Sequence, residues 1–203
     1  MLSIIEDQLS EIIESKLSYL KNTPSVIPKI LNINPTRLAR ISQYVQKMPL
    51  KVIRGFPRTP SDLPCICILL SNDDETQDGL GNIEMDEDTD DELLEVLYSS
   101  SYRAEVWSDN GDLTVELYHL LKWALLSGRK DLIKQGLFNQ KLGGTDFEPA
   151  PEYFPIFVYR RALTFWCQTV ESVLLVSSGD PVTGVVITDH YISEQVVIDT
   201  EEE

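Results

Sequence analysis

Acidic side chains gathered in one stretch are the residues of this chain best suited to hold a metal ion. Twelve Asp and Glu residues, and no Lys or Arg, fall between residues 73 and 95. A twelve-residue calcium loop needs glycine at position 6 and a bidentate carboxylate at position 12. Counting from Asp73 places Asp78 where the glycine is needed. Counting from Asp74 places Met85 where the carboxylate is needed. Neither register fits, so we expect a solvated, mobile acidic loop without a metal.

The histidines and cysteines form no arrangement typical of catalysis. His119 and His190 have no neighbouring nucleophile pattern, and the pair Cys65 and Cys67 lacks the second ligand pair of a zinc site. The chain contains no P-loop, no nucleophile elbow and no HExxH sequence. We therefore expect no enzyme, no cofactor and no metal. An enzyme with an unrecognised site is the alternative, and turnover by the isolated chain would reveal it.

The three cysteines predict a reducing compartment in which buried thiols act as small apolar side chains. We expect Cys65 and Cys67 to point to opposite faces of a strand and to remain unbonded.

Four acidic residues fall within the first 20 positions, where a secretory signal would have none, and no apolar run is long enough to span a bilayer. We expect a soluble protein that is intracellular when made.

Negative charge is concentrated in two segments. The formal net charge is −16, and besides the stretch at 73–95, seven acidic residues and no basic ones fall between residues 180 and 203. The other parts of the chain hold 14 acidic residues against all 17 Lys and Arg. Such a chain repels nucleic acid rather than binding it.

The pattern of apolar residues predicts an α+β fold. It has a small mixed or antiparallel sheet packed against a central helix, with an N-terminal helical arm at residues 1–48. Residues 49–203 form the α+β domain, which carries the acidic insert 71–95. The elements expected from periodicity and turn residues are helices at 2–21, 36–47, 113–127 and 129–135, a linker at 22–35, strands at 64–70, 98–108, 153–176 and 182–198, and a glycine-bearing loop at 139–146.

Four residues are candidates for a subunit interface: Arg160, Arg161, Trp166 and Trp107. Arg160 and Arg161 are adjacent in a strand, so they project from opposite faces. Either each pairs with a nearby carboxylate at the sheet surface, or one bridges to an acidic patch on a neighbouring subunit. The tryptophans are core residues or interface anchors, because an exposed indole is costly.

The order of elements after residue 50 resembles the tail terminator and neck proteins of tailed bacteriophages. The resemblance is carried by Tyr102–Ser108, the turn Asp109–Asp112, Leu117–Leu126, Leu137–Asp146 and Val158–Phe165. It implies a structural virion protein of the neck or tail, assembled in the host cytoplasm, that forms a hexameric ring. The ring would join the tail tube to the head and let DNA pass. Its partners would be other copies and the tail tube, sheath, connector and stopper proteins, with no membrane.

The same resemblance makes the acidic insert a candidate lining of the lumen. The residues concerned are Asp73, Asp74, Glu75, Asp78, Glu84, Asp86, Glu87, Asp88, Asp90, Asp91 and Glu92. An acidic wall would repel DNA phosphates as the genome slides past. Two alternatives remain: a head-completion adaptor or stopper of the neck, and an acidic DNA-mimic or regulatory binding protein.

Overall fold

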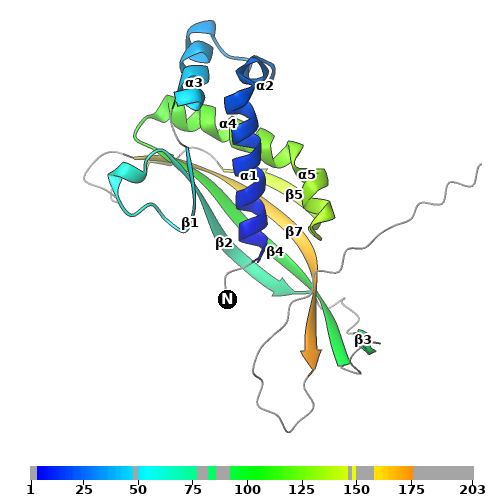
Figure 1. The fold of residues 1–203 in the computed structure, drawn as a ribbon. Helices are drawn as coiled ribbons and strands as arrows, with labels where there is room; N and C mark the ends of the chain where they lie inside the picture. The colour runs from blue at the N-terminus through cyan, green and yellow to red at the C-terminus, as the bar shows by residue number, and fades with distance from the viewer. Residues whose placement is uncertain are drawn as a thin grey trace, which may run out of the picture.

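The fold is α+β, with helices layered on a mixed sheet (Figure 1). A computed structural model describes residues 4–47, 50–76, 82–85, 92–145, 148–149 and 158–175 of the 203-residue chain. The helices are α1 (Ile4–Asn22), α2 (Ile27–Ile30), α3 (Pro35–Lys47), α4 (Gly111–Ser127) and α5 (Arg129–Lys134), with 3-10 turns at Pro24–Val26 and Pro60–Asp62. The strands are β1 (Lys51–Arg54), β2 (Cys65–Glu75), β3 (Asn82–Met85), β4 (Glu92–Ser108), β5 (Phe138–Gly144), β6 (Glu148–Pro149) and β7 (Tyr159–Leu175).

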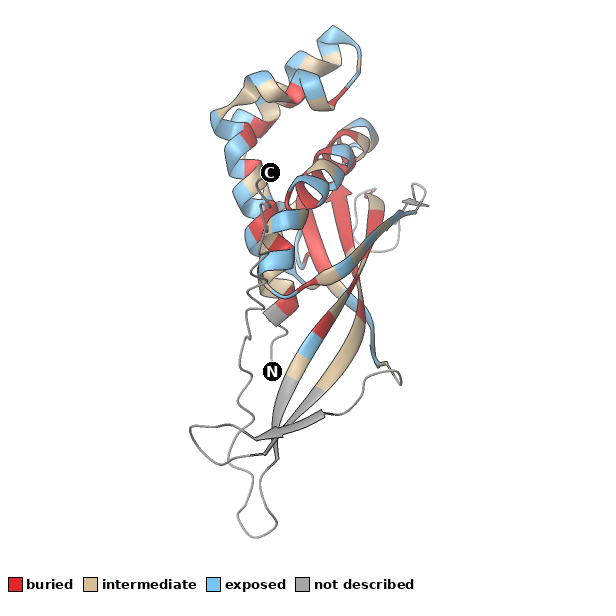
Figure 2. Ribbon diagram, turned by 90° about the vertical axis from the view of Figure 1, so that its right-hand side faces the viewer, coloured by how far each residue is buried: buried red, intermediate tan, exposed pale blue. Residues whose placement is uncertain are grey.

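The sheet is ordered β1-β2-β4-β7-β5, with β3 pairing β4 and β6 pairing β7. The pair β1–β2 is parallel and the other pairs are antiparallel. The described helices gather on one side of this sheet, and buried residues line the junction between the two layers (Figure 2). The expected α+β class, with a mixed sheet against a helix, is therefore confirmed.

Helix α4 forms the centre of the helical layer. The Asn110 side chain caps its start by accepting a hydrogen bond from the Leu113 N–H at 3.1 Å, and Gly128 follows its end. Its Leu117, Leu120 and Leu121 are almost completely buried against the sheet. The helix expected at residues 113–127 is therefore confirmed. Its broad apolar face packs on the sheet, and its cap fixes where it begins.

The N-terminal helices share the main core with the sheet. Leu9, Ile13 and Leu20 of α1 are buried in the same cluster as the inward residues of β2, β4 and β7. The expected linker at 22–35 is wrong in part, because it contains α2, where Ile27 is fully buried. Its prolines sit at the first positions of a short turn and a short helix, where a missing N–H costs nothing.

A second, smaller core lies on the other side of the sheet. It contains Cys65, Cys67, Trp107 and Val158. The expectation that the two cysteines face opposite ways is wrong, because side chains two residues apart in a strand share a face. Their sulfurs lie 3.8 Å apart and both thiols are free. The contact with Cys65 and burial raise the pKa of the Cys67 thiol.

Two expected loops contain strands. Residues 71–75 continue β2, and residues 82–85 and 92–95 belong to β3 and β4, so these parts of the acidic insert are strand rather than loop. The glycine-bearing segment at 139–146 is mostly β5, which pairs with β7. Other expectations fall outside the described residues: the positions of Asp78, Asp86, Glu87, Asp88, Asp90 and Asp91, the start of the strand at 153–176, and the strand at 182–198.

Candidate assembly surfaces

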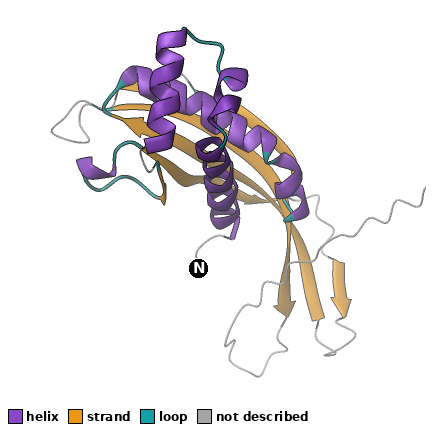
Figure 3. Cartoon of the chain, turned by 45° about the horizontal axis from the view of Figure 1, so that its top comes forward, coloured by secondary structure: helices purple, strands orange, loops and turns teal. Residues whose placement is uncertain are grey.

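Strands β4 and β7 extend beyond the helices that cover the rest of the sheet (Figures 1 and 3). Each is 17 residues long, and they pair along their full length from Glu92 opposite Leu175 to Ser108 opposite Tyr159. We call the projecting part, with the end of β2, the ribbon (residues 72–75, 92–99 and 168–175). A two-stranded β-structure alone is marginally stable in water. The ribbon therefore depends on the body at one end and gains from any surface that covers it.

The ribbon carries six acidic residues and no Lys or Arg. Asp73, Asp74 and Glu75 are exposed at the end of β2. Asp73 accepts a hydrogen bond from the Ser100 Oγ at 2.6 Å, which fixes it on the strand. Burial, and then the charge of Asp73, raises the pKa of Glu171 on β7. The negative charges thus act on one another across three strands.

Apolar groups are also exposed on the ribbon. Val170 is 44% exposed, and it lies opposite the partly buried Leu97 in the β4–β7 ladder. At the ribbon's start, Leu70 is 46% exposed. Apolar side chains gathered on a projecting, acidic element are typical of an interaction surface.

The predicted interface residues separate into core and surface positions. Trp107 is only 1% exposed, and the Phe56 ring contacts it edge-on at 6.0 Å. It belongs to the second core, so the interface role is corrected in favour of the core role. Trp166 is half-buried, and the Lys141 ammonium lies 4.7 Å from its ring centre. Trp166 thus keeps part of its ring available at the sheet surface.

The two arginines lie on opposite faces of the sheet, as predicted. The Arg160 guanidinium lies over the Trp107 ring at 5.9 Å, and that of Arg161 lies over the Tyr118 ring of α4 at 4.1 Å. Among the described residues Arg161 forms no ion pair, so its expected carboxylate partner is replaced by an aromatic face. Such a contact holds the guanidinium against the helix and leaves its charge uncompensated.

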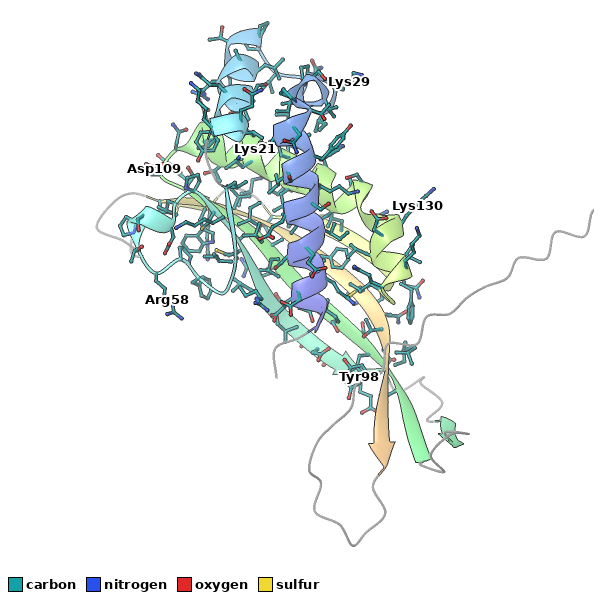
Figure 4. All side chains as sticks on the ribbon, in the orientation of Figure 1. Lys21, Lys29, Arg58, Tyr98, Asp109 and Lys130 are labelled. Atoms are coloured by element: carbon teal, nitrogen blue, oxygen red, sulfur yellow. The ribbon has the colours of Figure 1, made fainter. Side chains whose placement is uncertain are left out.

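A basic region lies at the other end of the molecule, and the sequence interpretation missed it. Residues 15–61 contain nine Lys and Arg and no Asp or Glu, a count as one-sided as that of the acidic insert. Five of the nine bind carboxylates outside this segment or at its border: Lys16, Arg37, Arg40, Lys51 and Arg54. Lys21, Lys29, Lys47 and Arg58 are exposed and form no ion pair with any described residue. Figure 4 shows Lys21 and Lys29 far from Tyr98, where the ribbon begins.

An apolar groove of about 530 Å³ lies between α1, α3 and β1. Its walls are mainly apolar, and Glu14, Ser18, Lys21 and Lys51 also line it; the apolar lining is Leu17, Tyr44, Val45, Leu50, Val52, Ile53 and Leu117. Burial, and then the charge of Asp109, raises the pKa of Tyr44 to about 12. Its hydroxyl is buried with no hydrogen-bond partner among the described residues. The groove thus combines apolar walls, a phenol that can still donate, and charged groups at its rim, two lysines and one carboxylate.

Metal and membrane sites were also sought. Across the described ranges, no three His, Cys, Asp or Glu side chains converge as metal ligands. No described helix has both the length and the apolar character to cross a bilayer.

No protein-family model matches the chain, and no curated protein matches it. The features of this chain that bear on its function are therefore the ribbon, the groove and their charges.

Proposed function

We propose that this chain is a structural subunit of the neck of a tailed bacteriophage. In this role it forms a ring that terminates the tail tube, joins it to the head and lets DNA pass. The observation that carries the proposal is the acidic ribbon, which projects from a folded body and has no covering layer among the described residues. A subunit that projects part of its own sheet gains stability when a neighbour covers that part. The order of strands and helices after residue 50 supports the same class.

Charge on the ribbon suits a passage for DNA. Duplex DNA carries one negative charge per roughly 1.7 Å of its axis, so a cationic wall would hold it firmly. Asp73, Asp74 and Glu75 are placed on a strand and exposed. Carboxylates fixed in this way repel phosphates without needing to reorganise. A ring in which one face of each ribbon contacts the next copy and the other face is turned inward would keep the genome from sticking to its wall.

The position of the ring follows from particles assembled without this chain. If it is the tail terminator, electron microscopy is expected to show filled heads beside tails of uncontrolled length. If it is an adaptor or stopper, heads without attached tails are expected, with tails of normal length. Supplying the wild-type chain in trans is the control and is expected to restore joined particles. Normal, infectious particles in its absence would contradict the proposal.

A second function, the acidic DNA mimic, is favoured by one observation. Asp73 and Glu75 share one face of a strand, where same-face residues are spaced by roughly 6.6 Å. Two phosphate steps on one DNA strand advance by about 6.8 Å along the axis. A mimic binds a basic DNA-binding protein as a single copy and is displaced by DNA. A ring subunit assembles with itself in the absence of any partner, so the mass of the purified chain separates the two.

A further inference from the structure

We infer that copies of this chain associate head to tail, with the ribbon of one copy seated in the groove between α1, α3 and β1 of the next. The inference rests on the proposed function, because it names the contact that would build the ring. The occupant of the groove is therefore a second copy of this chain. Charge complementarity, apolar complementarity and distance within the molecule each support this assignment.

Distance excludes docking within one chain. The ribbon continues β4 and β7, which pair with each other without interruption from the body to the end of the ribbon, so it cannot fold back. Lys21 and Lys29 lie near the far end of the helical layer, and Tyr98 marks the start of the ribbon at the opposite end (Figure 4). Two different surfaces joined between copies make a heterologous contact, and such contacts build a ring when the rotation closes.

Charge makes the ribbon and the groove opposite in sign. The ribbon holds six acidic residues and no basic ones, whereas the groove is lined by two lysines, Lys21 and Lys51, and one carboxylate, Glu14. Two ribbons repel each other, and so do two basic regions, so a symmetric contact of like ends is disfavoured. Opposite ends attract, and the attraction weakens as salt shortens the Debye length below about 8 Å.

Apolar surface and an open strand edge complete the match. The exposed Val170 and the partly buried Leu97 give the ribbon an apolar patch for the walls of the groove. Strand β1, whose residues Lys51 to Ile53 line the groove, is one edge of the described sheet. An extended element can add to such an edge through backbone hydrogen bonds. Exposed edges otherwise invite uncontrolled pairing, which a specific occupant prevents.

Two charge-reversed variants test the contact. The ribbon variant carries Asp74→Lys and Glu75→Lys, and the groove variant carries Lys21→Glu and Lys51→Glu, the two lysines that line the groove. All four side chains are exposed. We expect each variant alone to associate at least about 100-fold more weakly than the wild type, because like charges then face each other. An equal mixture is expected to regain assembly, since the two reversed charges of each ribbon variant can meet the two reversed charges of a groove variant, and the unchanged ribbon of the groove variant can meet the unchanged groove of the ribbon variant. Light scattering after size-exclusion chromatography gives the masses.

The matched control carries Lys130→Glu and Lys134→Glu on α5, which makes the same charge change at exposed positions away from the groove. It is expected to assemble like the wild type, and circular dichroism checks the fold of every variant. If single variants assemble as the wild type does, or if the mixture stays monomeric, the head-to-tail contact is overturned while wild-type rings still support the proposed function. A wild type that never assembles overturns the proposed ring itself.

Discussion

Replacing Gly128 with Ala is expected to destabilise the protein, although alanine fits the backbone there. Gly128 has φ −86° and ψ −4°, a conformation open to any residue. By itself the change would stabilise the fold by about 0.4–1 kcal/mol, because it restricts the unfolded chain. The added Cβ, however, would lie 2.4 Å from the Ile12 Cγ2 of α1. Carbon atoms pack at about 3.5–4.0 Å, so α1 or the turn after α4 must move by more than 1 Å.

The expected cost follows from these two effects. Overpacking a filled core costs about 1–3 kcal/mol, and the backbone gain offsets part of that. We expect a net loss of about 1–2 kcal/mol in the free energy of unfolding. For a chain of about 200 residues this lowers Tm by about 2–8 °C. The Cγ2 atom is attached directly to the Cβ of Ile12, so rotating the end of the side chain does not relieve the contact.

A double-mutant cycle isolates the contact. Ile12→Ala removes the clashing methyl and costs stability by leaving a cavity, because Ile12 is only 8% exposed. The double variant is expected to be more stable than the sum of the two single changes predicts, by about 1–3 kcal/mol. Gly143→Ala is the control, since its Cβ would meet the nearest atom at 3.8 Å. Additive effects measured by urea unfolding would refute the close approach of α1 to this turn.

Two further changes test the charges. Glu171→Gln is expected to raise Tm at pH 7, because burial and the charge of Asp73 raise the pKa of Glu171 above its usual 4.5. The stability of the wild type therefore falls as the pH rises from that value through the folded-state pKa. A Tm–pH series with the same slope in variant and wild type would contradict this. Arg37→Met is expected to lower the urea midpoint of unfolding, because Arg37 Nε donates a hydrogen bond at 2.9 Å to Glu116, which is 2% exposed and keeps only Arg40 as a basic partner. An unchanged urea midpoint would show that Arg40 alone is enough to compensate the charge of the buried Glu116.

The sequence predicted best those elements in which local signals agree with burial. Helix α4 has a capping Asn110, a broad apolar face and a terminal glycine, so its bounds were predicted closely. Strand β5 was missed because Gly143 and Gly144 are typical of loops. In the structure Gly144 is needed in the strand, since a Cβ would lie against the Tyr118 hydroxyl of α4. A close approach by an element that is distant in the sequence does not change the local pattern of apolar residues.

The ribbon was missed for a related reason. The consecutive carboxylates at Asp73–Glu75 favour exposure to solvent, and an exposed acidic stretch by itself indicates a loop. The structure keeps them in a strand because β2 pairs with β4 from Cys65 to Glu75, with one shift of register between Leu70 and Asn72. The pairing of β2 with β4 is a tertiary effect, and the local sequence of β2 does not indicate it. The basic region at 15–61, in contrast, was available from the sequence by simple counting of charges.

Zero-length crosslinking tests the head-to-tail contact most directly. A carbodiimide joins a lysine to a carboxylate only where the two touch. Equal amounts of unlabelled and ¹⁵N-labelled chain are mixed, crosslinked and analysed by mass spectrometry. We predict mixed-isotope peptides that join Lys21 or Lys51 of one copy to Asp74 or Glu75 of another, and their loss at high salt. Crosslinks confined to single copies, or mixed crosslinks that never involve the ribbon, would contradict the account.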